Sequence, residues 1–252
     1  MLETTTAVRY VTPLREGGSL PGIVEAEDFG TYVVKFHGAG QGPKVLVAEV
    51  IVGELARRLG IPVPELKTIE LDEAIGLREP DPEVQDLLVS SAGLNLAVDF
   101  LPGSLGYDGI SFAPDRGLAA RILWLDALVA NVDRSWRNPN LLVWHRTLWA
   151  IDHGAALYFH HNWSAAERFS RQPYNAADHI FHAYAPGIGA ADAALAPQVT
   201  EDLLSEVVAL VPQGWLATDT THGSVEATRR AYVEHLVARL GERPSWLPRI
   251  AA

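Results

Sequence analysis

Two segments in the second half of the chain carry side chains suited to phosphate chemistry. Asp133 and Asn138 lie in the polar stretch 131–138, and Asp152 follows a short apolar segment further on. Phosphoryl transfer needs a carboxylate beside the attacking hydroxyl, together with a carboxylate and an amide for Mg²⁺. These three side chains supply that set, so the sequence predicts a phosphoryl-transfer site here.

A β-hairpin is expected to bring Asp152 back to the polar loop. Residues 140–152 predict two strands that turn at 145–147, and side chains alternate along a strand. Leu148, Ala150 and Asp152 are therefore expected on one face. Taken singly, each polar residue has a simpler explanation as a turn cap, a turn residue or a strand end, but together and in this order they favour phosphoryl transfer.

A lysine in the first half is a candidate for binding nucleotide phosphates. Residues 31–36 predict a strand whose Tyr32, Val34 and Phe36 face a core, which places Lys35 on the opposite face. Only three of the 20 basic residues are lysines, so a lysine here stands out. A solvated lysine on a half-exposed sheet explains the position equally well.

Two further features accompany this lysine. A helix is predicted over 44–59, where Glu49 interrupts an apolar face and needs a partner, for which Lys35 is the clearest candidate. The turn Gly17-Gly18-Ser19 can cover phosphates with its backbone N–H groups. The simpler explanations are a glutamate at the edge of the apolar face and an ordinary glycine-rich turn.

The order of predicted elements indicates an α+β fold with two lobes. Residues 1–98 are rich in strands around one helix, with a polar insert at 79–86, and are expected to bind the nucleotide phosphates. Residues 99–252 are expected to be mostly helical around the hairpin, with helices at 118–130, 200–210 and 224–240, and to hold the catalytic loop and acceptor site.

The Asn-x-Asp-x-x-x-x-Asn pattern at 131–138, with the hairpin and Asp152, resembles the catalytic loop of the HipA-like kinases. These are bacterial relatives of the protein kinase and phosphatidylinositol kinase folds. The segment from Glu49 to Pro64 also resembles their helix-C region. The resemblance implies a bilobal protein-kinase-like fold and the use of ATP and Mg²⁺.

The resemblance also implies roles for single residues. Asp133 is implied as the catalytic base, with Asn138 and Asp152 as magnesium ligands; Asn140 is the alternative to Asn138. Lys35 is implied to bind phosphate and Glu49 to orient it. The implied hinge, which binds adenine through its backbone, is Asp99, Phe100 and Leu101.

The acceptor is left open between three alternatives. The resemblance favours serine or threonine hydroxyls of a protein. The others are a small-molecule phosphotransferase of the same fold and a nucleotide-binding pseudokinase. A pseudokinase usually lacks one of the five polar residues present here, which are Lys35, Glu49, Asp133, Asn138 and Asp152. Two departures from the family pattern bear on the substrate, namely Ser135 where relatives often carry histidine, and His153 after Asp152.

Composition narrows the partners. A net charge of −11 makes nucleic acid a poor partner, and the absence of cysteine excludes disulfides and thiolate chemistry. No signal peptide or apolar run of about 20 residues is evident, so no membrane partner and a cytoplasmic location are expected. An antitoxin-like partner is left open, without support in the sequence.

Histidines and tryptophans offer two further hypotheses. His179 and His182, or the pair His160-His161, have the spacing of metal ligands but lack a third ligand. We favour instead a substrate-facing segment over 159–185. Trp136 lies inside the polar loop and is a candidate for shaping the acceptor site, whereas core packing is expected for Trp124, Trp144 and Trp149.

Overall fold

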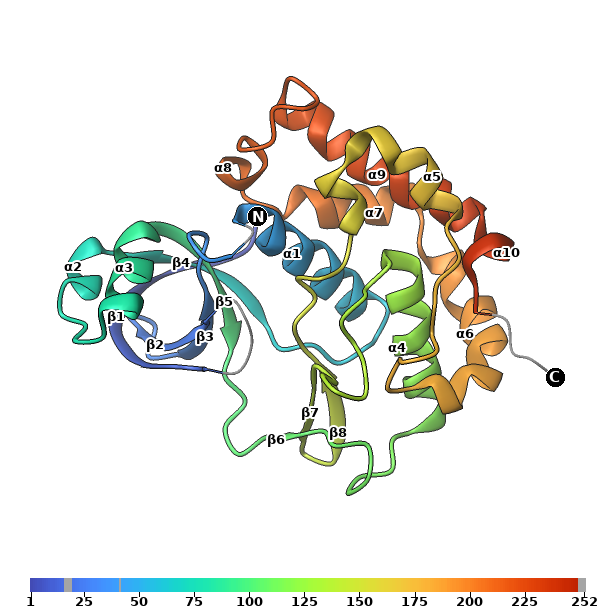
Figure 1. The fold of residues 1–252 in the computed structure, drawn as a ribbon, viewed down its shortest axis with the longest axis horizontal. Helices are drawn as coiled ribbons and strands as arrows, with labels where there is room; N and C mark the ends of the chain where they lie inside the picture. Colours follow the sequence, from blue (N-terminus) through green and yellow to red (C-terminus); the bar gives the residue numbers. More distant parts are fainter. Residues whose placement is uncertain (16–19, 41, 249–252) are drawn as a thin grey trace. The chain divides into compact units, whose positions relative to one another are not determined.

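The computed structural model describes residues 1–15, 20–40 and 42–248, and its chain forms two compact units (Figure 1). The first unit comprises Met1–Val47 and Pro64–Pro102. The second comprises Ala48–Val63 and Gly103–Ala252. Neither unit is one continuous segment of the chain.

A five-stranded closed barrel forms the first unit. Its strands are β1 (Thr4–Pro13), β2 (Gly22–Ala26), β3 (Thr31–Lys35), β4 (Leu66–Leu71) and β5 (Gly93–Asp99). Their order around the barrel is β1-β2-β3-β5-β4. The contact that closes it is the parallel pairing of β1 with β4, where Thr5 lies opposite Ile69. This pairing joins strands that are far apart in the sequence.

The barrel interior follows the alternation predicted for 31–36. Tyr32, Val34 and Phe36 lie in its buried apolar cluster, which confirms their face of β3. The same cluster includes Val84 and Leu88 from a helix that the sequence analysis did not predict.

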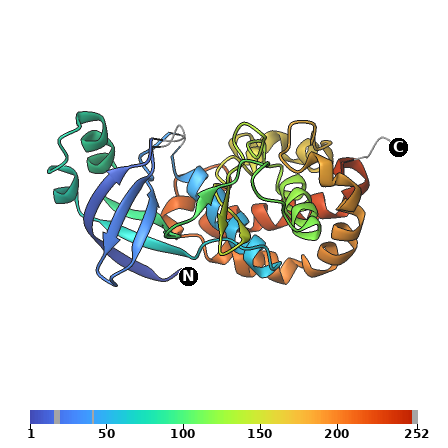
Figure 2. The ribbon, with the colours of Figure 1, turned by 90° about the horizontal axis from the view of Figure 1, so that it is seen from below.

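That helix is α3 (Pro82–Ser90), which follows the short helix α2 (Glu73–Gly76) beside the barrel (Figure 2). The polar insert predicted at 79–86 is therefore partly helical. Asp81 caps α3, because its side chain accepts a hydrogen bond from the Glu83 N–H. Proline at the first helical position costs no hydrogen bond, so Asp81 and Pro82 together start the helix.

Helix α1 (Pro43–Arg58) confirms the predicted helix and runs through the boundary between the units, after Val47. Residues 48–63 belong to the second unit, whereas we had expected everything before residue 99 in the first lobe. Hydrogen bonds within the second unit explain this, since Ala150 N–H donates to Pro62 O at 2.8 Å and Arg121 donates to Leu59 O. Arg58 pairs with Glu206 at 2.9 Å.

Helices make up most of the second unit. The α-helices are α4 (Arg116–Val129), α5 (Ala166–Arg171), α6 (Ile188–Leu195), α7 (Glu201–Ala209), α8 (Gln213–Leu216), α9 (Val225–Gly241) and α10 (Arg243–Trp246). The 3₁₀ helices are η1 (Tyr158–His161), η2 (Trp163–Ala165), η3 (His182–Gly187) and η4 (Ala196–Gln198). Helix α4 is central, since residues 122–129 are buried without interruption, and it contacts α6 and α9. In the described residues, no helix has the length and apolar character needed to span a membrane.

A small sheet in the second unit contains the predicted hairpin. Strands β7 (Leu141–Trp144) and β8 (Thr147–Ala150) pair antiparallel, and β6 (Leu105–Gly106) adds an edge strand to β7. The turn residues His145 and Arg146 both have positive φ, at 47° and 61°. This conformation matches the twist of the two strands, so the turn sets the register of the hairpin.

The end of α4 is strained at Ala130, whose φ of 52° and ψ of 45° lie in the left-handed region. A residue with a Cβ pays about 1–2 kcal/mol to adopt this conformation, and glycine avoids that cost. Glycine also has more freedom in the unfolded chain, which lowers stability by about 0.5–1 kcal/mol. We expect Ala130→Gly to raise the free energy of unfolding by about 0.5–1 kcal/mol. Urea denaturation measures this, and Ala127→Gly inside the same helix should instead lower stability; a loss in both variants would contradict the explanation.

Candidate active site

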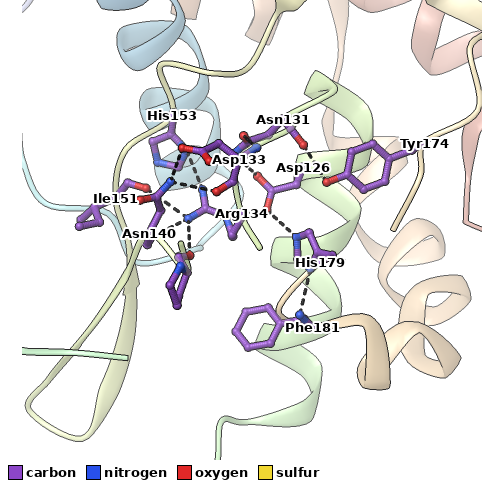
Figure 3. Close-up of polar contacts among 11 residues, drawn as sticks. Asp126, Asn131, Asp133, Arg134, Asn140, Ile151, His153, Tyr174, His179 and Phe181 are labelled. Atoms are coloured by element: carbon purple, nitrogen blue, oxygen red, sulfur yellow. Dashed lines mark hydrogen bonds and ion pairs between the residues drawn. The ribbon is translucent and has the colours of Figure 1, made fainter. Parts of the chain in front are cut away.

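The loop after α4 gathers polar groups around Asp133 (Figure 3). Asn138 Nδ2 donates to Asp133 Oδ2 at 2.8 Å, and Asn140 Nδ2 lies 3.3 Å from the same oxygen. Asn140 Nδ2 also donates to the Asp133 carbonyl at 3.2 Å, and Asp133 N–H donates to Asn131 Oδ1 at 3.1 Å. The carboxylate therefore has a fixed position, and the loop residues predicted from the sequence do lie together.

Arg134 of this loop forms a buried ion pair with Asp126 of α4, which the sequence analysis did not predict. Arg134 Nε donates to Asp126 Oδ2 at 2.6 Å, and both side chains are almost fully buried, at 0% and 1% exposed. Arg134 also donates to the carbonyls of Asn140 and Ile151 and lies 3.2 Å from His153 Nδ1. One side chain thus joins α4, the Asp133 loop and the end of β8.

His179 is a second partner of Asp126 and contacts the same carboxylate oxygen as Arg134. Its Nδ1 accepts the Phe181 N–H at 3.0 Å, so the proton lies on Nε2, which donates to Asp126 Oδ2 at 3.0 Å. Burial alone raises the pKa of the Asp126 carboxyl, but Arg134 and His179 outweigh it and lower that pKa below its usual range. Asp126 therefore stays ionised and holds two segments against α4.

The segment around His179 is also hydrogen-bonded to the Asp133 loop through its backbone. Trp136 N–H donates to Asp178 O and Ile180 N–H donates to Arg134 O, both at 3.2 Å. Tyr174 OH donates to Asn131 O at 2.8 Å. These contacts fix residues 174–180 beside the loop.

Asp152 lies one residue beyond the last backbone contact of the hairpin. Ile151 N–H donates to Asn140 O at 3.0 Å, which places residues 151–152 beside the loop, as the hairpin predicted. The expected strand face is wrong for Asp152, however, because β8 ends at Ala150 and the φ of Asp152 is 54°. A left-handed residue ends the alternation of side chains, so the direction of this carboxylate is set by a turn.

The side-chain oxygens of Asn138 and Asn140 are available to other partners. Because the nitrogens of Asn138 and Asn140 face Asp133, their side-chain carbonyl oxygens point elsewhere. Among the described residues, no group of three or more His, Asp or Glu side chains is placed to hold a metal ion. Mg²⁺ commonly takes one or two protein ligands and completes its shell with water and phosphate oxygens, so one carboxylate and one amide fit it.

The predicted nucleotide contacts are divided between the units. Lys35 lies in β3, where it pairs in register with Leu96, and Glu49 lies in the part of α1 that belongs to the second unit. Their pairing stays a prediction. Gly17, Gly18 and Ser19 lie outside the described residues.

Two of the three predicted hinge residues already donate their backbone N–H groups to other residues of the protein. Asp99 N–H donates to Glu65 O at 2.9 Å and Phe100 N–H donates to Thr31 O at 3.1 Å. Within the described chain, Leu101 N–H has no such partner. The N–H groups of Asp99 and Phe100 are therefore not available to adenine. The predicted contact is left with the Leu101 N–H and with backbone carbonyls.

The histidines of the alternative metal hypothesis have protein partners. His179 contacts Asp126, His182 Nδ1 donates to Ala176 O at 2.9 Å, and His160 Nδ1 lies 3.0 Å from Tyr232 OH. Trp124 is fully buried, as expected, whereas Trp136 is 58% exposed with the Arg137 guanidinium 4.1 Å from its ring centroid. Trp144 and Trp149 pack edge to face on the hairpin and are half-buried.

Comparison with protein families shows which family the chain belongs to. Residues 8–247 match the family model described as HipA-like kinase. The chain belongs to the HipA-like kinase family. This HipA-like kinase is therefore a phosphotransferase, and it has a mixed α and β fold of the kinase type. No curated protein sequence matches it.

One solved structure supports the fold, and two others are found at lower similarity. This HipA-like kinase is similar to the Helicobacter pylori proinflammatory kinase CtkA, with a TM-score of 0.60 and 11% identity over 98% of this chain and 95% of the other. The Golgi casein kinase is also found, with a TM-score of 0.45 and 14% identity over 96% of this chain and 73% of the other. Its Mn/ADP-bound structure has the same TM-score and 13% identity, over 94% and 73%.

Proposed function

We propose that this kinase transfers the γ-phosphoryl group of ATP, with Mg²⁺, to the hydroxyl of a protein serine or threonine. The observation that carries the proposal is the Asp133 carboxylate, held by two amides in a loop that the hairpin joins to Asp152. A carboxylate, an amide and a second carboxylate are the groups that such a transfer uses. The protein acceptor is favoured by the family resemblance.

In this reaction Asp133 acts on the acceptor. Its carboxylate orients the hydroxyl and takes up its proton as the oxygen bonds to the γ-phosphorus, while the bond from that phosphorus to the bridging oxygen of ADP breaks. The amide donors from Asn138 and Asn140 keep Asp133 from turning away. Products are ADP and the phosphorylated acceptor.

The remaining residues position the nucleotide. Asp152 and the side-chain oxygen of Asn138, or of Asn140, would hold Mg²⁺, which neutralises charge on the phosphates when bound. Lys35 would bind the phosphates, with Glu49 orienting it, and Leu101 would contact adenine. We assign the first lobe the nucleotide phosphates and the second the acceptor, and we place the reaction in the cytoplasm.

Incubation with ATP labelled at the γ-phosphate tests this function. The purified chain and its Asp133→Ala variant are each incubated with magnesium, with and without a bacterial lysate, and the products are separated on gels and by thin-layer chromatography. We expect a labelled protein band that requires Asp133. Label only in a small metabolite would instead indicate a small-molecule phosphotransferase, and no transfer at all would indicate a pseudokinase.

Asp152→Asn is expected to remove most of the magnesium dependence of nucleotide binding. A neutral amide is a weaker ligand for a hard cation than a carboxylate. Nucleotide titrations in magnesium and in EDTA measure this, with the exposed Asp202→Asn as the control. Equal magnesium dependence in the Asp152 variant and the wild type would contradict the assignment.

A further inference from the structure

A cavity of about 320 Å³ lies in the second unit, bordered by the catalytic loop. This volume is at the lower end of the range of about 300–1,000 Å³ typical of small-molecule sites. Its apolar walls come from α4, η1 and α5 and include Leu128, Val129, Phe159 and Phe169. Every residue that lines it belongs to the second unit.

This cavity is separate from the group that acts on the acceptor. Asn131, Val132, Arg134 and Ser135 line it, but Asp133 does not. The Asp133 carboxylate faces Asn138 and Asn140 instead. A molecule in the cavity would therefore touch the catalytic loop without occupying the place of the acceptor hydroxyl.

His235 on α9 is a buried side chain that lines the cavity and makes no hydrogen bond within the described part of the chain. Its side chain is stacked on Phe159 with 3.5 Å between ring centroids, and the residue is 7% exposed. Within the described residues, neither ring nitrogen makes a hydrogen bond. Burial, and after it the nearby Arg239, lower the pKa of His235 to about 4, so the neutral ring has one N–H to donate and one nitrogen to accept.

Arg239 determines which charge the cavity accepts. Its guanidinium is buried at 2% exposed and donates to the carbonyls of Ala127, Leu128, Phe169 and Gln172. No carboxylate of the described chain pairs with it, and the carbonyls at the end of α4 offset its charge only in part. Asp178 is the one carboxylate among the lining residues, and it is exposed to solvent, which screens its charge, whereas Arg239 is buried. A cation beside His235 and Arg239 would therefore be repelled.

We propose that this cavity is a binding site for a small aromatic molecule that is uncharged or anionic and that hydrogen-bonds to His235. An aromatic body fits walls that include Phe159 and Phe169, and the polar group would satisfy the histidine. The proposal goes beyond phosphoryl transfer, since it needs neither ATP nor an acceptor.

Three probes of nearly equal shape test the charge argument. Benzamide, benzoate and benzamidine are neutral, anionic and cationic at pH 7, and each is titrated into nitrogen-15-labelled protein followed by NMR. We expect benzamide and benzoate to bind with Kd of about 1 mM, and benzamidine at least about tenfold more weakly. Failure of both benzamide and benzoate to saturate would overturn the proposal, as would equal binding of benzamidine.

Variants test the location. His235→Phe keeps a ring against Phe159 but removes the hydrogen bond, so benzamide should bind about fivefold more weakly. His222→Phe is the matched control, because His222 packs on Trp163, away from the cavity. Tyr158→Ala, which opens one exposed wall, should also weaken binding without disturbing the fold. Unchanged affinity in both His235→Phe and Tyr158→Ala would overturn the site.

A last measurement separates this site from the proposed function. Benzamide should bind to Asp133→Ala as tightly as to the wild type, because the cavity does not include Asp133. A tenfold loss of affinity in that variant would contradict a separate site. Binding can thus be established even if no acceptor is ever phosphorylated.

Discussion

Asp133→Ala is expected to lower the rate of phosphoryl transfer by about 10²–10⁴-fold, which is the usual cost of removing a positioned base. Nucleotide affinity should change little, because the role we propose for this carboxylate is on the acceptor hydroxyl. The measurement is label transfer from ATP, with nucleotide binding followed separately by titration.

Two controls sharpen this result. Asp202→Ala removes an exposed carboxylate at the start of α7 and should leave transfer unchanged. Thermal unfolding of Asp133→Ala shows whether the loop still folds. Retention of at least half of the wild-type rate in a folded variant would show that Asp133 is not the base.

Arg134→Leu is expected to lower the free energy of unfolding by about 3–5 kcal/mol, as is typical when one partner of a buried ion pair is removed. Loss of Arg134 leaves the Asp126 carboxylate buried with only neutral donors. It also removes the hydrogen bonds through which Arg134 links the carbonyls of Asn140 and Ile151 to Asp126 on α4. Urea denaturation at pH 7 measures the change. Arg137→Leu, an exposed arginine of the same loop, should cost less than about 1 kcal/mol.

The pH dependence of this difference has a defined sign. In the wild type the pKa of Asp126 is lowered, so its ion pair stabilises the fold above the ordinary value of 3.8 and is lost only in stronger acid. Without Arg134, burial raises the pKa of Asp126, and protonation relieves the unpaired charge as the pH falls. The gap between wild type and variant should therefore shrink toward pH 4, and a constant gap would contradict this account.

The grouping of polar side chains in the Asp133 loop was predictable because they lie in a short stretch of sequence. Asp133 and Asn138 are five positions apart, and a hairpin with a clear turn brings 151–152 back to them. Contacts of this kind depend on local structure, which periodicity and turn residues encode well.

The buried ion pair depends on contacts between distant segments and was missed. Asp126 did give a signal, as a lone carboxylate in the apolar helix that becomes α4, and a buried charge needs a partner. Nothing local identifies that partner as Arg134 together with His179, so His179 was weighed as a metal ligand instead. The parallel pairing of β1 with β4 was missed for the same reason.

The helix that passes from one unit into the other limits how this kinase can be dissected. A fragment starting at residue 99 or 103 would lack Pro62 and Leu59, whose carbonyls accept hydrogen bonds from Ala150 and Arg121. A fragment ending at residue 98 would carry residues 48–63 without the partners they pack on. Expression of either lobe alone is therefore expected to give an unstable product, and chemical denaturation of the intact chain should show both units unfolding together.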